Sequence, residues 1–575
     1  MREILILQRI IQVGTNNIIM NKILSSIVLC AVASMATAQT LNNGITLPKV
    51  WPPQYQEPTE RHEMPVPYLQ NKPAVLPINN GRQLFVDSFL ISSTNLRSVY
   101  HTPNFYKGNP VLEPTEKWEN TTEGAPYAAP FSDGIWYDEK EGIFKMWYLA
   151  GAGTMHKQSN QTFYTCYAES KDGKNWKKVN LDIVPGTNIV DTCDRDAATI
   201  WLDRTEKNPE RRWKLFNIER RPGDGRWQII LKYSADGRKW SRGVAQSGDV
   251  YDRTTAFYNP FTKRWALSLR WSTPVSMRSR AYAENEDPEM LVSLTHRIRK
   301  DAADRNIRFW FTPDDKELRH PKYPDVEPGI YNFDVIAYES IMLGQYAAWC
   351  GPENDICKRD GIQKRNVIEL GYSRDGFHFA RPTHQPFMNV NETEGAWNWG
   401  NMQSINGTPL IVGDSLYFYS SGRRLNKIMW DSYTSTGLAV LRRDGFVSMH
   451  ADAKEGYLTT EKLSFDGKYF FVNADVKGKG AQLKVELLDA DGNPIPGFTK
   501  RDCVVMRGAD KTKQLITWKG KQDLTELQGR TIRAKFYLTR GDLYAFWISP
   551  WASGESRGYT GGGGPGLNAS GVDTK

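Results

Sequence analysis

The tetrapeptide Ser170-Lys-Asp-Gly173 decides the fold, because the same Ser-x-Asp-Gly pattern returns as Ser234-Ala-Asp-Gly237 and Ser373-Arg-Asp-Gly376. A looser copy is Arg442-Arg-Asp-Gly445. Each of the first three copies follows a strand-like run, and an aromatic residue stands three positions after its glycine. Asp-Gly between two such runs predicts a β-hairpin, since glycine accepts the positive φ that the turn requires.

The spacing of these turns indicates a repeated unit. Gly173 and Gly237 are 64 residues apart, Gly237 and Gly376 are 139 apart, and Gly376 and Gly445 are 69 apart. The long interval equals two units, so a further copy is expected near residue 305, with Arg308-Phe-Trp-Phe311 as its remnant. Five units, each long enough for four short strands, predict an all-β chain built on a five-bladed β-propeller.

Changes in composition divide the chain into five expected parts. Lys22 precedes an apolar stretch, and Ala36-Thr-Ala38 offers a small-x-small cleavage site, which together predict an export signal and a periplasmic or extracellular location. Leu84-Phe-Val-Asp-Ser-Phe-Leu-Ile91 is the expected first strand. The parts are an N-terminal extension with the signal (1–38), an irregular Pro-rich leader (39–80), the propeller (81–449), a C-terminal β-sandwich (450–552) and a disordered tail (553–575).

Charge and residue counts exclude several classes of protein. The net charge of +9 is spread along 575 residues without a basic run, so no nucleic-acid partner is expected, although an acidic glycan is compatible with it. No segment after the signal is apolar enough to span a membrane. The cysteines lack CxxC spacing and the eight histidines lack HxxxH or HxH spacing, so neither a catalytic metal nor another cofactor is expected. The oligomeric state and any structural Ca²⁺ are left open.

Three acids occupy the same place in three related stretches. Asp196, Asp252 and Asp334 each lead a run of β-branched, small and aromatic residues. Inner strands of a propeller begin around its central channel, so these acids are expected to converge there. A pair of carboxyl groups is what glycoside hydrolysis requires, one as acid and one as nucleophile or base. Glu339 is the expected acid, although its odd separation from Asp334 places the two on opposite faces of a regular strand.

The chain resembles the family 32 glycoside hydrolases, the invertase and fructanase group. The resemblance is carried by Leu84–Ile91, Arg195-Asp196, Tyr331–Ser340, Trp397–Asn401 and Gly413–Tyr419. It implies that Arg195-Asp196 matches a pair that binds sugar hydroxyls and steadies the transition state. The family's Asn-Asp-Pro-Asn-Gly nucleophile motif and its Glu-Cys dipeptide are absent, so fructoside specificity does not transfer.

These observations predict an exported, exo-acting glycoside hydrolase for a terminal sugar, with furanosides among the candidates, of a plant or algal glycan. The alternatives are a non-catalytic carbohydrate-binding propeller, or a transferase or phosphorylase on the same scaffold. The null interpretation is that the acids cap turns and the tryptophans belong to the core. The candidate catalytic residues are Asp196, Asp334, Glu339 and Asp252, with Glu123, Asp133 or Asp87 as the first-blade acid; the candidate substrate-binding residues are Arg195, Arg253, Arg365, Trp397 and Trp399.

Overall fold

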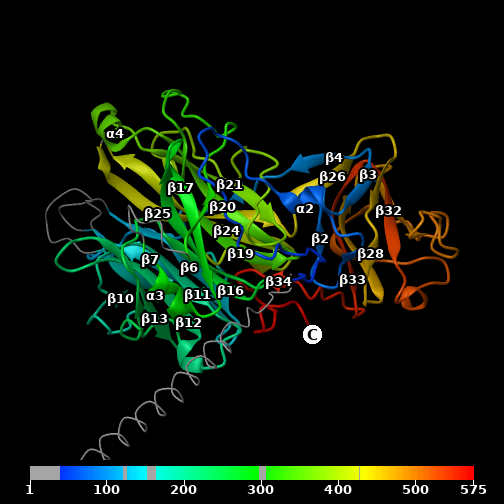
Figure 1. The fold of residues 1–575 in the computed structure, drawn as a ribbon, viewed down its shortest axis with the longest axis horizontal. Helices are drawn as coiled ribbons and strands as arrows, with labels where there is room; N and C mark the ends of the chain where they lie inside the picture. Colours follow the sequence, from blue (N-terminus) through cyan, green and yellow to red (C-terminus); the bar gives the residue numbers. More distant parts are fainter. Residues whose placement is uncertain (1–38, 121–125, 152–162, 297–305, 427) are drawn as a thin grey trace, which may run out of the picture. The chain divides into compact units, whose positions relative to one another are not determined.

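The computed structural model describes residues 39–120, 126–151, 163–296, 306–426 and 428–575 (Figure 1). Residues 39–40 and 46–51 belong to one unit, in which Thr40 and Thr46 pair as an isolated β-bridge. Residues 41–45 and 52–575 form the other unit and carry everything discussed below. The helices described there are short, α2 (Pro67–Gln70), α3 (Pro288–Leu294) and α4 (Asn354–Asp360), and none has the length and apolar character needed to cross a membrane.

Three antiparallel sheets follow one another along the chain. The first contains β6 (Ala128–Asp138), β7 (Ile143–Ala150), β8 (Tyr164–Ser170), β9 (Lys177–Lys178) and β10 (Ile189–Asp191). The second contains β11 (Arg195–Leu202), β12 (Trp213–Arg220), β13 (Trp227–Ser234) and β14 (Ala245–Gln246). The third contains β15 (Thr255–Asn259), β16 (Arg264–Thr273), β17 (Ser276–Asn285) and β18 (Arg308–Phe311).

The next strands form one continuous nine-stranded sheet. It contains β19 (Gly329–Glu339), β20 (Ile341–Gly351), β21 (Arg365–Ser373), β22 (Asn401–Gln403), β23 (Leu410–Val412), β24 (Ser415–Asn426), β25 (Ile428–Arg442), β5 (Asn104–Phe105) and β34 (Tyr559–Thr560). A parallel pairing of Asn366 with Asn401 joins β21 to β22. The all-β prediction is confirmed, whereas the count of five blades stays a prediction because β19–β25 are not divided into two sheets.

The first strands of successive sheets lie side by side and are tied to one another (Figure 1). The Trp136 indole on β6 donates a 2.7 Å hydrogen bond to the carbonyl of Ile200 on β11. Thr255 on β15 donates a 2.8 Å bond to the carbonyl of Phe333 on β19. The strands β6, β11, β15 and β19 are therefore neighbours, although they are far apart in sequence.

The repeated Ser-x-Asp-Gly turns have the predicted conformation. Gly173, Gly237 and Gly376 have φ of 72°, 76° and 81°. In each turn the serine hydroxyl accepts the glycine N–H, at 2.8–2.9 Å. A Cβ atom on Gly237 would lie 2.4 Å from the Trp147 ring, so this glycine is also required for packing between neighbouring sheets.

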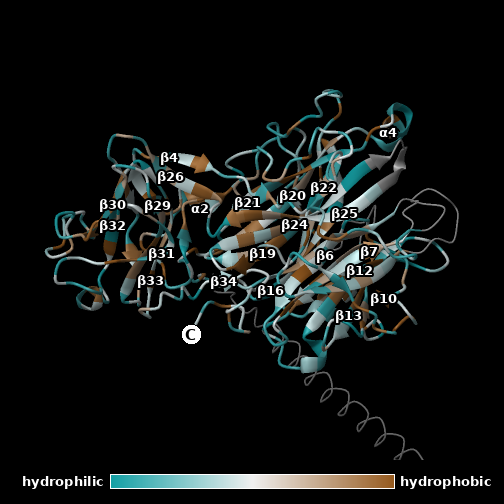
Figure 2. Cartoon of the chain, turned by 180° about the vertical axis from the view of Figure 1, so that it is seen from behind, coloured by the Kyte–Doolittle hydropathy of each residue, from teal (hydrophilic) through white to brown (hydrophobic). Residues whose placement is uncertain are grey.

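The C-terminal strands form two six-stranded sheets with strands from residues 76–100. Aromatic rings pack between them, with Phe536 and Phe546 at a centroid distance of 5.4 Å. Figure 2 shows hydrophobic and hydrophilic residues mixed along these strands, and β32 alternates between buried and partly exposed positions. One sheet contains β1 (Leu76–Pro77), β28 (Leu463–Ser464), β32 (Ile532–Thr539), β27 (Gly456–Thr460), β3 (Ile91–Thr94) and β30 (Gln482–Asp489); the other contains β31 (Ala509–Ile516), β29 (Tyr469–Val476), β33 (Gly541–Ser549), β26 (Val447–Ala451), β4 (Arg97–Tyr100) and β2 (Gln83–Leu84).

The first strand predicted for the propeller therefore belongs elsewhere. Gln83 and Leu84 pair with Phe546 and Ala545 of β33, at the far end of the sequence. The hydrophobic run 84–91 predicted one strand, but only its two ends lie in strands, Leu84 in β2 and Ile91 in β3, because residues 85–90 form bends and a turn. A local pattern also cannot name the sheet in which a strand pairs.

The predicted disorder of residues 553–575 is wrong. Tyr559–Thr560 pairs with β19, and the backbone of Gly562 accepts a 2.9 Å hydrogen bond from the Tyr137 N–H. A Cβ atom on Gly562 would lie 1.7 Å from the Gly407 carbonyl oxygen. The glycine run suggested flexibility, but here it allows backbones to approach where no side chain would fit.

Candidate active site

Four neighbouring strands meet around the guanidinium of Arg253. Asp196, at the start of β11, accepts hydrogen bonds from Arg253 Nη2 at 2.8 Å and from the Arg253 backbone N–H at 3.0 Å. The same guanidinium lies 3.4 Å from the ring centroid of Phe131 on β6 and 5.2 Å from that of Tyr331 on β19. Arg253 is 4% exposed and has a positive φ of 58°, a strained conformation for a non-glycine residue.

Asp252 is the most accessible of the predicted acids. It directly precedes Arg253, and its side chain is 25% exposed. Its Oδ1 accepts a hydrogen bond from Arg270 on β16, while Oδ2 has no hydrogen-bond partner among the described residues. Burial would raise the pKa of Asp252, but Arg270, Arg253 and Arg278 together hold that pKa below its ordinary value. Asp252 is therefore an ionised carboxylate with one free oxygen.

Tyr331 brings a second titratable group to the same place. It is buried near the start of β19, and its ring centroid lies 4.3 Å from the Arg278 guanidinium and 5.6 Å from Lys364 Nζ. Burial would raise the pKa of this phenol, but Lys364, Arg253 and Arg278 lower it to about 7 because they stabilise the phenolate. The phenol can therefore lose or gain a proton near neutral pH.

Two further acids lie deeper and are enclosed. Asp334 Oδ2 accepts hydrogen bonds from Ser132 at 3.0 Å, Asn332 at 2.9 Å and Ser404 at 2.5 Å. Asp133 forms a two-pronged ion pair with Arg195, at 2.6 Å and 2.9 Å. Burial raises the pKa of both Asp133 and Asp334 to about 6. Both side chains are buried, and Asp133 is enclosed by its ion pair, whereas Oδ1 of Asp334 has no hydrogen-bond partner among the described residues. Their burial indicates that they support the inner strands rather than contact a substrate.

Arg195 therefore does not bind sugar hydroxyls as the family resemblance implied. Its side chain is buried, and it is turned towards Asp133 rather than towards solvent.

Glu339 is not part of this site. It ends β19, where its Oε2 accepts hydrogen bonds from the Arg82 backbone N–H at 3.1 Å and from Ser556 at 2.7 Å. Its Oε1 lies 3.2 Å from Arg443 Nη2, and its side chain is fully buried. The prediction that Glu339 supplies the acid is wrong, because a carboxylate enclosed among ion pairs cannot reach a substrate.

The other candidates for the first-blade acid are placed differently. Asp87 is buried against Arg374, with a 2.9 Å contact to Nη2. Glu123 lies outside the described residues. Of the two described alternatives, Asp133 comes from an inner strand that reaches the Arg253 cluster, and Asp87 does not.

Trp397 and Arg365, two of the predicted substrate-binding residues, have partners other than the cluster. A Cβ atom on Gly437 would lie 2.0 Å from the Trp397 ring, which shows that this ring packs flat against β25. The ring also contacts Phe105 edge to face at 5.8 Å. Trp399 is half-buried, and Arg365 forms a 2.7 Å ion pair with the exposed Glu392. Trp397 therefore has a packing role.

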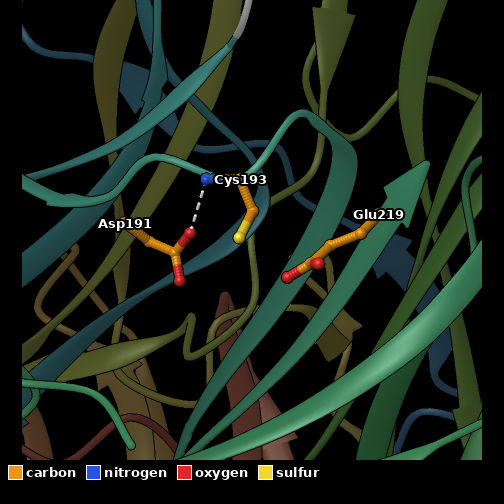
Figure 3. A group of neighbouring side chains, drawn as sticks. All are labelled: Asp191, Cys193 and Glu219. Carbon is orange, nitrogen blue, oxygen red and sulfur yellow. Dashed lines mark hydrogen bonds between the residues drawn. The ribbon is translucent and has the colours of Figure 1, made fainter. Parts of the chain in front are cut away.

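In the described part of the chain, two groups of side chains have the composition of metal ligands, and each contacts a basic residue. Asp191, Cys193 and Glu219 converge in Figure 3. Lys232 Nζ lies 2.6 Å from Asp191 Oδ2, 2.8 Å from Glu219 Oε1 and 3.4 Å from Cys193 Sγ. The ammonium group thus occupies the position of a cation.

The second group of side chains contacts a guanidinium. Asp314, Glu317 and His384 lie together beside Arg381. Arg381 Nη2 is 2.9 Å from Glu317 Oε2, and Arg381 Nη1 is 3.5 Å from Asp314 Oδ2. Both groups are buried ion-pair networks in which the protein supplies its own cation.

The sequence did not single out Tyr331, Lys364 or Arg270. Tyr331 stands at the head of the third related stretch, as Tyr251 stands at the head of the second, and this common position was the available signal. Lys364 and Arg270 offered none, because they come from the end of a loop and the middle of a strand.

Comparison with known proteins adds the following findings. No family model and no curated protein matches the chain. A glycosyl hydrolase from Bacteroides ovatus is 13% identical and has a TM-score of 0.39, with 63% of this chain and 97% of that chain covered. A β-fructofuranosidase from Schwanniomyces occidentalis is 10% identical and has a TM-score of 0.34, with coverage of 78% and 96%. A structure from the GH130 family of mannoside phosphorylases is 12% identical and has a TM-score of 0.38, with coverage of 60% and 94%. At these values no function is transferred, and the site is defined by its geometry alone.

Proposed function

We propose that the protein is an exported glycoside hydrolase that removes a terminal sugar from a plant or algal glycan. One observation carries the proposal: Asp196, Asp252 and Tyr331, from three successive sheets, gather around Arg253. Glycoside cleavage requires one group that gives a proton to the leaving oxygen and another that attacks the sugar or activates water. Asp252 and Tyr331 differ in charge and in proton affinity, as these two roles demand.

In this proposal Asp252 is the nucleophile or the general base, because it is ionised and has a free oxygen. Tyr331 is the proton donor: its phenol gives a proton to the glycosidic oxygen as the bond from that oxygen to the anomeric carbon breaks. Water supplies the hydroxyl group of the released sugar, and its second proton restores the phenol. Asp196 positions Arg253, since both carboxylate oxygens are engaged by that residue.

The test compares Asp252→Asn and Tyr331→Phe with wild type on a panel of aryl glycosides and oligosaccharides. Loss of a general acid or base lowers kcat by about 10²–10⁴-fold, so a decrease of this order is expected in both variants. Asp224→Asn and Tyr323→Phe, both at surface positions away from the cluster, serve as matched controls and should retain wild-type rates. Normal turnover in both site variants would dismiss the proposal.

A second candidate is a carbohydrate-binding protein without catalysis. It is favoured by the engagement of both Asp196 oxygens and by the enclosure of Asp133 and Asp334. Saturable sugar binding without any product, measured on the same panel, would support this alternative.

A further inference from the structure

Two cations beside Tyr331 have no carboxylate partner among the described residues. Lys364 is only 5% exposed, yet within the described ranges neither Lys364 nor Arg278 lies within 4.0 Å of a carboxylate oxygen. Their neighbours differ: Arg253 is paired with Asp196, and Arg270 is paired with Asp252. Of the described cations that lie over the Tyr331 ring, Arg278 and Lys364 are therefore the two without a carboxylate partner.

The protein bears an energetic cost for this arrangement. Burying a charge without a partner is unfavourable, and buried charges in proteins are normally paired. Nη1 of Arg278 and Nη1 of Arg253 are buried without a hydrogen-bond partner in the described part of the chain. Burial lowers the pKa of Lys364, and Arg278 and Arg423 lower it further although Tyr331 opposes them. Burial likewise lowers the pKa of Arg278.

We propose that Arg278 and Lys364 form an oxyanion site next to Tyr331, so that the terminal sugar carries a carboxylate or a sulfate ester. This inference rests on the proposed function, which it deepens by naming the substrate class. A guanidinium can hold two oxygens of such a group through parallel N–H bonds, while an ammonium acts as a point charge beside it. A bound oxyanion would supply the missing counterion for both cations.

The site also couples substrate binding to the proton donor. Arg278 and Lys364 are two of the cations that lower the pKa of Tyr331, and an oxyanion between them would cancel much of their effect. Binding of an acidic sugar would therefore raise the pKa of Tyr331 and keep its phenol protonated when a proton must be given. A neutral sugar would leave the phenol partly ionised at neutral pH.

The experiment measures binding without turnover, using the full chain and thermal shift together with calorimetry. The probes are D-galacturonate, D-glucuronate, N-acetylglucosamine 6-sulfate, their neutral counterparts and inorganic phosphate. We expect one acidic sugar to bind and its neutral counterpart to fail. Lys364→Met and Arg278→Gln should each weaken that binding at least 10-fold, whereas Arg365→Gln, next to Lys364 but paired with Glu392, should bind as wild type.

The Tm of each variant shows whether the substitution has affected folding. Because Lys364 is buried without a carboxylate partner among the described residues, Lys364→Met should have a Tm equal to or above that of wild type. Bound acidic sugar should also shift the Tyr331 titration, followed at 295 nm, to higher pH, and a role of Lys364 in folding alone would not produce that shift.

Each outcome of the binding and cleavage assays supports or overturns the oxyanion site or the proposed function. Binding of no acidic sugar, or equal binding by both variants and wild type, overturns the inference. Binding of inorganic phosphate alone overturns its acidic-sugar part and identifies free phosphate as the ligand. Cleavage of neutral glycosides without anion binding removes this inference and leaves the proposed function intact. Binding of an acidic sugar that is never cleaved upholds the oxyanion site and removes the proposed function.

Discussion

Replacing Glu339 by glutamine distinguishes a structural carboxylate from a catalytic one. The side chain of Glu339 is fully buried and lies between Arg82 and Arg443, with Oε1 at 3.5 Å and 3.2 Å from them. Asp444, which is also buried, contacts Arg82 at 2.8 Å. Glutamine keeps the shape but removes the charge, so Arg82 would keep only Asp444 as its ion-pair partner, and Arg443 would keep only the 3.8 Å contact with Asp573. Removing one partner of a buried ion pair costs about 3–5 kcal/mol, and we expect Glu339→Gln to lose stability of this order.

Urea unfolding followed by tryptophan fluorescence provides the measurement, with the first unfolding transition compared between variants. Glu392→Gln is the matched control: this residue also pairs with an arginine, but its side chain is 74% exposed. An exposed pair contributes about 0–1 kcal/mol, so the control should unfold almost as wild type does. Active protein remaining after purification should have unchanged kcat in both variants. A large loss of kcat in Glu339→Gln with unchanged stability would refute the reasoning and return Glu339 to the reaction.

Three further predictions concern separate parts of the molecule. The pKa of Tyr331 in the folded protein is about 7, below the ordinary value of 10.0, so absorbance at 295 nm should show a step near pH 7 that Tyr331→Phe removes. Because the folded pKa is depressed, the stability that the Tyr331 phenolate contributes is fully present above the unfolded pKa. This stability is lost as the pH falls through 7. A titration with every step near pH 10 would contradict this. Lys232→Met should destabilise the protein by about 3–5 kcal/mol, and added Zn²⁺ should restore part of the Tm if the three side chains of Figure 3 then bind it. Gly437→Val should lower the free energy of unfolding by about 1–3 kcal/mol, because the new side chain would displace the Trp397 ring. In the control Gly478→Ala, the nearest heavy atom would lie 3.9 Å from the new Cβ atom, so the loss should be much smaller. Equal urea midpoints for the two variants would contradict the packing assignment.

Local patterns were sufficient for the fold class. The Ser-x-Asp-Gly turns were predictable because the serine and aspartate side chains bind backbone groups within a few residues and glycine adopts the positive φ. The looser copy, Arg442–Gly445, has no serine, and its turn differs from the other three. In this copy Asp444, rather than Gly445, has a positive φ, of 62°. Turn chemistry acts over a few residues, so one sequence can reveal it.

Long-range pairing was decided by the tertiary structure alone. Asp196 was correctly expected at the head of an inner strand, but its partner Arg253 is 57 residues away, and the contact of Glu339 with Arg82 spans 257. The same applies to Leu84, whose strand pairs with β33, and to the glycine-rich tail, whose residues pack against β19. An acid can be recognised from its neighbours in sequence, but whether it faces a substrate or an arginine depends on which distant segment folds beside it. Those distances, and the burial that they create, set its charge and its accessibility.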